Sequence, residues 1–449
     1  MADKSDFQNL YSLDGRVPVS KAILIGAQHV LAMFVANIAP ILLICTGARY
    51  NGIIFSDMDL AKSLQASLLI AGIGTMIQLY PVWRIGARLP IVMGVSFTFA
   101  GALIPLAAED FGIAVGAIII GGCIEGILGL TVRYWRKLIS PVVSASVVLS
   151  IGLSLLGTGI NTAISSINYE SGSWQNLTVA GITLAACLLF RSLLNNFGKQ
   201  LYILLGLLVG YIAALLMGMI NYSDIKNIVN NLGIVSFPRL FAFTPQFHLG
   251  AIINVALVYL VSAVETIGDS STICTSVLNR EITERELQGA LTCDGFISAI
   301  SGGVFGCTPI TSFSQNVGMI FMTGIVNRFT IFFGALLLIL AGFFPPIGAF
   351  LATLPDCALG GCTIVMFGSI VIAGIRMLTF CKLNERNSLI VSISLCIGLG
   401  ITQVQDFFKD MPDIVYEIFA NNSVAGVFVV ALILNFVLPK NMENKISRK

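Results

Sequence analysis

Charged residues are scarce in this sequence. Asp, Glu, Lys and Arg make up 11% of the 449 residues, whereas a typical soluble domain carries about 25%. Hydrophobic residues make up 56% of the chain, and its mean hydropathy is +0.91. This balance excludes a soluble domain and predicts an all-α polytopic membrane protein surrounded by membrane lipid. The net charge is only +2 and no basic patch is present, so no nucleic-acid partner is expected.

Histidine and paired cysteines are also nearly absent. His29 and His248 are the only two histidines, and none of the ten Cys residues forms a CxxC pair. Neither a metal site nor a disulfide framework is therefore expected, and no cofactor is predicted. The polar start of the chain mixes acidic and basic residues, which is unlike a cleavable signal peptide.

Long apolar runs, by contrast, are abundant. A membrane-spanning helix needs about 20 predominantly apolar residues, and on that basis we predict fourteen spans. They are roughly 22–45, 64–83, 90–106, 112–132, 139–159, 177–194, 200–220, 249–267, 287–303, 308–325, 329–345, 350–375, 388–404 and 421–438.

The positive charges test this number of spans. With the N-terminus in the cytoplasm and the sides alternating, 20 Lys and Arg residues fall inside and 5 outside, which together make the 25 in the chain. Cytoplasmic loops of membrane proteins carry such an excess. We therefore expect a multi-pass membrane protein, with a cytoplasmic N-terminal segment at 1–21 and a cytoplasmic tail at 439–449.

Two of the predicted spans are interrupted by polar and flexible residues. Span three contains GVSFTFAG at 94–101, and span ten lies within the Gly-, Pro- and Ser-rich stretch 302–324. Irregular backbone at membrane depth is tolerated only where protein buries it or where it lines a cavity. Both stretches share a Ser-Phe-Ser/Thr core and lie seven spans apart, which predicts an inverted repeat with a substrate site between its halves.

Two acids of the eighth span are candidates for function. Glu265 and Asp269 are four residues apart and so share one face of a helix. A charge at the bilayer centre costs about 2.5–3.5 kcal/mol on insertion scales, and two close carboxylates in a low dielectric favour a shared proton. Proton coupling is therefore predicted. Alternatively, Asp269 forms an ion pair with Arg280 or bonds the backbone.

The other ionisable residues inside spans are harder to assign. Asp294 lies in a Gly/Ser-rich span, where proton coupling and a structural cap are both reasonable roles. His29 follows Gln28 in the first span, and we expect it to hydrogen-bond one of the carboxylates. Glu125 and Asp356 have no evident partner, so packing or span-end roles are favoured and their function stays open.

Polar and aromatic groups in the broken spans suit a flat polar ligand. The amides of Gln315 and Asn316 match the carbonyl and N–H edge of a planar molecule, and Phe99 offers a stacking face. Backbone N–H groups near Phe99 and Gly318 can bind oxygen atoms at half-helix ends. The alternative for the two amides is a hydrogen bond that joins neighbouring helices.

These residues resemble a known family. The stretch 315–324, QNVGMIFMTG, is similar to the signature of the nucleobase–ascorbate transporters, also called the nucleobase:cation symporter-2 family. The resemblance extends over nearly the whole chain. Further agreement lies in Gln28-His29, Gly94–Phe99, Glu265–Asp269 and Asp294-Gly295.

The resemblance implies a particular architecture. Fourteen spans form two inverted seven-span repeats, and spans three and ten each contain a short strand. A core domain takes 22–132 (spans 1–4) and 249–345 (spans 8–11). A gate domain takes 139–220 (spans 5–7) and 350–438 (spans 12–14). Members are typically homodimers that move the core against the gate like an elevator.

The resemblance also implies roles for the candidate residues. Glu265 and Gln315 would hydrogen-bond the base, Phe99 would stack on it and lend its backbone, and Asn316 would shape the site. Three further residues would support the site and the proton coupling, namely His29, Asp269 and Asp294.

The same resemblance bears on the substrate. Gln at position 315 resembles the xanthine and urate branch, because the uracil branch carries Glu there. Thr98 would contact the C8 oxygen of urate. The expected function is a proton-coupled symporter that imports xanthine or uric acid. A uracil permease and an anion transporter of the same architecture are the alternatives, and sodium stays an alternative coupling ion. An enzyme is not expected, since no metal-ligand cluster or nucleophile–base pair is evident.

Overall fold

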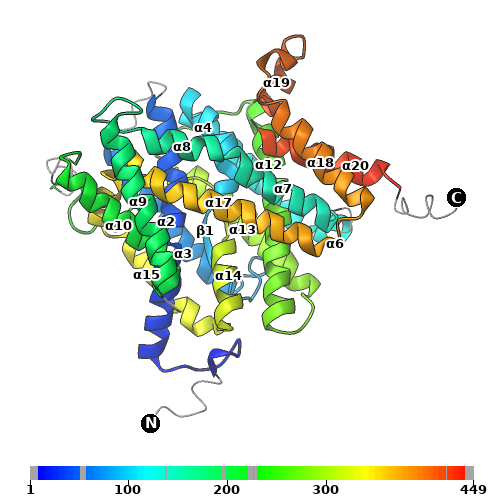
Figure 1. Ribbon diagram of the computed structural model, residues 1–449. Coiled ribbons are helices and arrows are strands. Elements are labelled where there is room, and N and C mark those ends of the chain that lie inside the picture. The colour runs from blue at the N-terminus through cyan, green and yellow to red at the C-terminus, as the bar shows by residue number, and fades with distance from the viewer. Residues whose placement is uncertain are drawn as a thin grey trace.

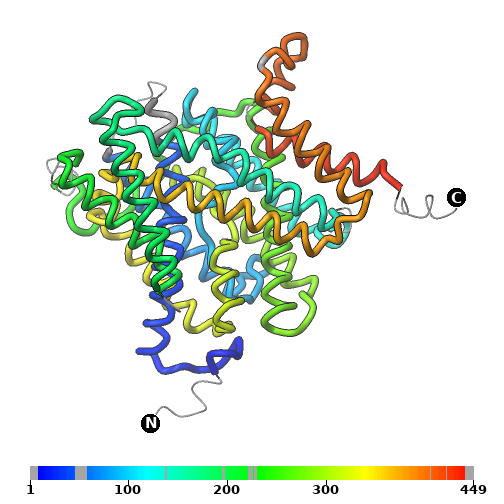
Figure 2. Tube along the Cα trace, in the orientation of Figure 1, coloured from blue at the N-terminus to red at the C-terminus, as the bar shows by residue number. Residues whose placement is uncertain are grey.

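Helices make up nearly all of the structure. The computed structural model describes residues 9–50, 57–136, 139–194, 198–220, 226, 230–420 and 422–439. Most of the predicted tail at 439–449 and the first eight residues of the predicted N-terminal segment lie outside these ranges. Figure 2 shows that the N-terminal segment and the last helix lie far apart in the molecule.

The elements follow one another without any separate soluble domain in the described residues. In the first half they are α2 (Val19–Tyr50), α3 (Asp57–Leu79), β1 (Met93–Val95), η1 (Phe97–Phe99), α4 (Ala100–Glu109), α5 (Phe111–Leu130), α6 (Val132–Trp135), α7 (Pro141–Ser154), α8 (Leu156–Ile164), α9 (Trp174–Leu193), η3 (Gly198–Gln200) and α10 (Tyr202–Leu216). In the second half they are α12 (Leu249–Thr272), the π-helix η4 (Ile273–Val277), α13 (Glu284–Phe305), β2 (Ile310–Ser312), α14 (Ser314–Thr323), α15 (Arg328–Gly342), α16 (Pro345–Ala352), α17 (Asp356–Phe380), α18 (Glu385–Gly400), η5 (Gln405–Phe408), α19 (Asp413–Phe419) and α20 (Ser423–Val437).

The two strands confirm the predicted breaks in spans three and ten. β1 and β2 pair antiparallel with Met93 opposite Ser312, Gly94 opposite Thr311 and Val95 opposite Ile310. They lie near the middle of the molecule, with α9 and α10 packed together at one edge and α18 and α20 at the other (Figure 1). Each strand runs directly into a short helix, η1 and α4 after β1 and α14 after β2. The chain therefore stops being helical at its centre in both halves.

Polar side chains from two neighbouring helices bond the free edge of β1. The Asn37 side chain on α2 accepts a hydrogen bond from the backbone N–H of Val95 at 2.7 Å. The Thr75 hydroxyl on α3 accepts from the N–H of Met93 at 2.9 Å. Because an unpaired backbone group inside a bilayer costs several kcal/mol, these contacts allow a strand to exist there.

The free edge of β2 is bonded by α13 in the same way. The Ser298 hydroxyl donates to the carbonyl of Ile310 at 2.8 Å and accepts from its N–H at 3.1 Å. The Asp294 carboxylate accepts from the N–H of Ser312 at 2.9 Å. One helix therefore satisfies the backbone of β2 along most of its length.

Small residues let α5 and α13 approach closely. A Cβ added at Gly122 would lie 2.6 Å from the carbonyl oxygen of Gly295, and one added at Gly295 would lie 2.1 Å from the backbone nitrogen of Gly126. Glycine is required at both positions because the two backbones are in contact. Such small-residue packing is typical of helices inside membranes, and it holds α13 where its side chains reach β2.

We predicted fourteen spans, which is more than helix length and composition alone support. Each of the fourteen predicted segments contains a helix among the described residues. Seven helices in the described part are long and apolar enough to cross a membrane alone, or nine if each of two bent pairs is one span. The counts differ partly because the broken spans are split, so that α4 and α14 have only 10 residues each. An arrangement of fourteen spans in two inverted repeats therefore stays a prediction.

The bonding of β2 leads to a stability prediction. We expect Ser298→Ala to lower the free energy of unfolding by about 2–4 kcal/mol, because both polar groups of the Ile310 backbone lose their partner. Thermal melting of the purified protein in detergent measures the change. Ser392→Ala, an exposed hydroxyl bonded only within its own helix, is the matched control. Equal melting temperatures for the two variants would contradict this role for Ser298.

Candidate functional site

Glu265 on α12 is held by one hydroxyl from each broken span. Thr98 Oγ1 donates to Glu265 Oε2 at 2.9 Å, and Ser314 Oγ lies 2.9 Å from Glu265 Oε1. Thr98 belongs to η1 and Ser314 begins α14. The carboxylate is therefore fixed between the two places where the chain leaves its strands.

The two hydroxyls occupy matching positions in the two halves of the chain. Thr98 follows Ser96-Phe97, and Ser314 follows Ser312-Phe313. In both halves the serine of this pattern lies at the end of a strand or just after it, and the second hydroxyl lies in the helix that follows. The weak Ser-Phe-Ser/Thr similarity thus coincides with a shared structural role, since both halves bond one carboxylate.

Asp269 shares the same serine. Ser314 Oγ lies 2.6 Å from Asp269 Oδ2 as well as 2.9 Å from Glu265 Oε1. A serine hydroxyl has one proton and can donate it to only one of the two carboxyl groups. The other contact is a hydrogen bond only if that carboxyl group is itself protonated and donates to the serine oxygen. The geometry therefore accommodates one bound proton in the Glu265–Ser314–Asp269 cluster.

His29 contacts Asn316 rather than a carboxylate, so the expected partner was wrong. His29 is 2% exposed on α2, and its Nδ1 lies 3.0 Å from Nδ2 of Asn316 on α14. An amide nitrogen can only donate, so this contact gives the ring an accepting Nδ1. The reason is packing, because α2 contacts α14 directly. Asn316 thus joins two helices, while its Oδ1 has no partner among the described residues.

Gln315 and Gly318 share an open face of α14. Gln315 is exposed, and it lies three residues before Gly318, close to one helical turn. A Cβ added at Gly318 would meet nothing within 4 Å, and the same holds at Gly268, three residues after Glu265 on α12. Room for a side chain is therefore open at Gly318, beside Gln315 on α14, and at Gly268, close to one helical turn after Glu265 on α12.

Phe99 does not present a free stacking face in this structure. Its ring is 0% exposed and packs on Tyr259, with ring centroids 4.5 Å apart. This contact corrects the expectation of an available ring, because α12 brings Tyr259 against it. The backbone of Phe99 directly precedes α4, whose first N–H group, that of Ala100, donates to the carbonyl of Phe97.

The hydroxyl of Thr98 is likewise already engaged. Its proton is donated to Glu265, so it has no second proton for the C8 oxygen of urate. The inclination toward urate rested on such a donor, and this geometry does not supply it.

Asp294 is a structural junction. Its carboxylate is fully buried and accepts from Thr266 Oγ1 at 2.6 Å, Gln78 Nε2 at 3.0 Å, and Ser312 through N at 2.9 Å and Oγ at 3.1 Å. These donors come from α12, α3 and β2. Four donors occupy its acceptor positions, so Asp294 on α13 joins α12, α3 and β2.

Comparison with known proteins gives the family. A model described as "Permease family", that of the xanthine and uracil permeases, matches residues 20–407. The chain belongs to the xanthine/uracil permease family. As a member, it is a multi-pass nucleobase permease and not an enzyme.

The matches to individual relatives extend over nearly the whole chain. The xanthine permease XanQ of Escherichia coli is 32% identical over 454 residues, with 96% of this chain and 94% of that protein covered. The xanthine permease of Bacillus subtilis is 32% identical over 427 residues, with 93% of each chain covered. The structure of the murine anion transporter Slc26a9 shares the fold at a TM-score of 0.63 with 11% identity, and covers 93% of this chain and 68% of that one.

The site of the permease contains no positive charge. No ion pair in the described residues involves Glu265, Asp269 or Asp294, and Arg280, once considered for Asp269, pairs with Glu286 at 2.5 Å. No group of three or more His, Cys, Asp or Glu in that part of the chain is arranged to hold a metal ion. The carboxyl groups are therefore held by neutral donors only.

The structure shows the surroundings of Glu125 and Asp356, the two acids whose function the sequence left open. Glu125 on α5 is fully buried, and neither carboxyl oxygen has a hydrogen-bond partner among the described residues. Asp356 is the first residue of α17, where a carboxylate complements the positive end of the helix dipole.

Sequence reasoning missed Ser314 as a site residue, although its position in the polar run before Gln315 was a signal for it.

The bonding of Asp294 predicts a stability effect. Asp294→Asn should destabilise the permease by about 1–3 kcal/mol, because an amide nitrogen would then face donors. Melting in detergent measures this, with the exposed Asp413→Asn in the first turn of α19 as the control. An unchanged melting temperature together with lost transport would instead make Asp294 a direct participant in transport.

Proposed function

We infer that this permease is a proton-coupled symporter that imports an oxidised purine, xanthine or uric acid, through a bacterial-type inner membrane. Both chain termini would face the cytoplasm. The observation that carries this inference is the Glu265–Ser314–Asp269 cluster, in which one hydroxyl contacts two carboxyl groups. Such a cluster needs one proton to satisfy its contacts, and no Lys or Arg among the described residues forms an ion pair with it. Binding and release of that proton would be the coupling step.

The open faces beside the cluster fit a flat purine. In the proposed mode Glu265 accepts N–H groups of the base, while the exposed amide of Gln315 donates to one ring position and accepts from another. The absence of atoms within 4 Å of a Cβ at Gly268 or Gly318 supports placing the ring there. Asn316, held by His29, fixes the start of α14, which carries Gln315.

The packing of the helices supports an elevator mechanism. The most extensive contacts of α13 and α15 are with α5, α3 and α2, all within the proposed core. Those of α17 are with α7, α8 and α9, all within the proposed gate. Phe97 beside the site touches Phe367 on α17 with ring centroids 5.4 Å apart. We propose that the core carries proton and purine past this contact, within a homodimer and in a fourteen-span arrangement.

An anion transporter is the rival from another functional class. The fold similarity to Slc26a9 supports the architecture, but at 11% identity it carries no function. Anion binding calls for a cation or unoccupied helix N-termini at the site, whereas here two carboxyl groups line it. Among nucleobases, xanthine is favoured by relatives that are named xanthine permeases at 30–32% identity. Uracil stays the rival substrate, and sodium the rival coupling ion.

Uptake in a permease-deficient bacterial strain tests substrate and coupling together. We expect concentrative uptake of radiolabelled xanthine or uric acid, but not of uracil, and its collapse with a protonophore. Glu265→Gln should abolish concentrative uptake, while Glu109→Gln, an exposed acid at the end of α4, should transport normally. Full proton-driven accumulation by Glu265→Gln would refute the assignment. Uptake that depends on sodium and resists the protonophore would show that sodium, not the proton, is the coupling ion.

The serine between the carboxyl groups allows a sharper test. Ser314→Ala should reduce proton-driven accumulation about ten-fold or more, because a hydrogen bond to a charged group contributes about 1.5–3 kcal/mol. Ser314→Thr keeps the hydroxyl and should retain most activity. Uptake measured across the pH range from mildly acidic to mildly alkaline should show an altered pH profile only for the alanine variant. Identical pH profiles for all three proteins would show that Ser314 is not part of the coupling.

A further inference from the structure

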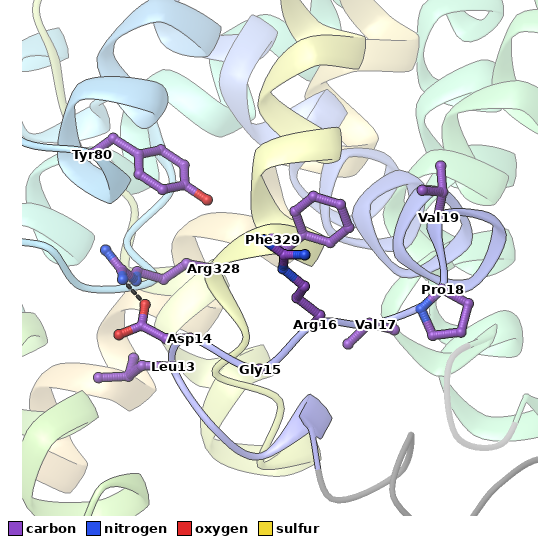
Figure 3. Close-up of a pocket in the computed structure, with 10 residues that line it drawn as sticks. All are labelled: Leu13, Asp14, Gly15, Arg16, Val17, Pro18, Val19, Tyr80, Arg328 and Phe329. Carbon is purple, nitrogen blue, oxygen red and sulfur yellow. Dashed lines mark ion pairs between the residues drawn. The ribbon is translucent and has the colours of Figure 1, made fainter.

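A second cavity lies away from the carboxylate cluster and shares none of its residues. It has a volume of about 520 Å³ and is enclosed by the N-terminal segment 13–19, by Tyr80 just after α3, and by the start of α15 at Arg328 and Phe329 (Figure 3). It therefore lies where the polar N-terminal segment meets the first turn of α2. Neither the resemblance to the family nor the proposed transport mechanism gives it a role.

Positive charge exceeds negative charge at this cavity. Asp14 forms an ion pair with Arg328, and its other neighbour is Arg88 at 3.5 Å. Arg16 lines the cavity and has no ion-pair partner among the described residues. The residues that line the cavity thus include two arginines and one carboxylate, and that carboxylate also faces Arg88 outside the lining, so positive charge is in excess.

Arg328 is unusual among these residues because it is buried. It is 6% exposed; its Nη1 donates to the carbonyl of Leu79 at 2.8 Å, while its Nε has no acceptor among the described residues. A buried guanidinium without a full set of acceptors is costly. An anion beside it would offset that cost. Figure 3 shows the Tyr80 hydroxyl directed toward the space between Arg328 and Phe329, where it can add a donor.

The surroundings of the cavity are apolar on the side of α2. Val19, Ile23 and Leu24 begin that helix and are 52%, 42% and 62% exposed. In a membrane protein such residues face lipid, and tyrosines such as Tyr80 mark the level of the headgroups. A ligand that fits both features has an anionic head and an apolar tail. A soluble anion would use only the arginines.

The segment that carries Arg16 is tied to the site by hydrogen bonds. The Asn327 amide donates to the carbonyls of Asn9, Ser12 and Gly15 at 3.0, 3.2 and 2.6 Å. Asn327 lies in the short connection between α14 and α15, and α14 carries Gln315 and Asn316. Any ligand that holds the N-terminal segment therefore also holds the end of a site helix.

We propose that this cavity binds the phosphate group of an anionic phospholipid. Arg16 and Arg328 supply the positive charge, the Tyr80 hydroxyl supplies a neutral donor, and the acyl chains follow the exposed side of α2. Phosphate suits paired guanidinium groups because their N–H groups match its oxygen atoms. The lipid stabilises the N-terminal segment against the connection between α14 and α15.

Native mass spectrometry of the purified full-length permease tests this binding. Protein in detergent is offered phosphatidylglycerol or phosphatidylcholine at equal concentration. We expect selective retention of phosphatidylglycerol, and a loss of about five-fold in Arg16→Gln, since one basic residue near a membrane surface contributes about that factor. Arg16 is exposed, so this variant should fold. Arg376→Gln, another exposed arginine on the predicted cytoplasmic side, is the matched control.

Three results would overturn the proposal. One is unchanged retention of phosphatidylglycerol in Arg16→Gln. Another is an equal loss in Arg376→Gln, which would indicate a general effect of charge. The third is displacement of the lipid by inorganic phosphate alone, which would make the cavity a site for a soluble anion. Arg16→Lys should fall between wild type and Arg16→Gln, because it keeps the charge but loses the paired N–H groups.

Discussion

The structure depends on one constraint, the need to hydrogen-bond every backbone group at membrane depth. Two spans break into strands at the centre of the molecule, where no water is available to replace lost helical bonds. β1 and β2 bond each other, and their outer edges are bonded by side chains of α2, α3 and α13. The polar residues of these three helices are therefore structural requirements of the broken spans. Because the broken ends are fixed from all sides, the groups that follow them are fixed as well.

The carboxyl groups of the site follow a second rule of the low-dielectric interior. Glu265 and Asp269 are contacted by neutral hydroxyl groups and by no Lys or Arg among the described residues, and we propose that protons rather than a permanent cation regulate their charge. Ser314 connects the two groups and makes their protonation interdependent. The anion transporter Slc26a9 shares the fold at 11% identity, so the fold alone does not assign the chemistry of the site.

The cytoplasmic end expected from the charge distribution has a different chemistry. Arginines accumulate there, and Asp14 alone does not neutralise those around the cavity at the start of α2. Asn327 links this cavity to the connection that follows α14. The permease thus contains a cluster of carboxyl groups at its centre and an arginine-lined cavity at its periphery, joined through the short helix α14 and Asn327.

The spans, the breaks in two of them and Glu265 were predictable because each depends on residues that are close together in the sequence. Apolar runs predict spans, and a Pro-, Gly- and Ser-rich stretch in such a run predicts a break wherever it occurs. Glu265 was predictable as a site residue because a carboxylate inside a span is costly unless it has a function. None of these inferences requires knowledge of a distant neighbour.

The partners of each residue were decided only by the tertiary structure. Ser314 and Asp269 are 45 positions apart, and Asn316 and His29 are 287 apart. Whether His29 meets an amide or a carboxylate, and whether the Phe99 ring faces a ligand or Tyr259, depends on which helices pack together. The sequence by itself thus determined where the chain had to break and where a charge had to have a purpose. Only the packing decided which donor met which acceptor, because hydrogen bonds act over about 3 Å in space, whatever the separation along the chain.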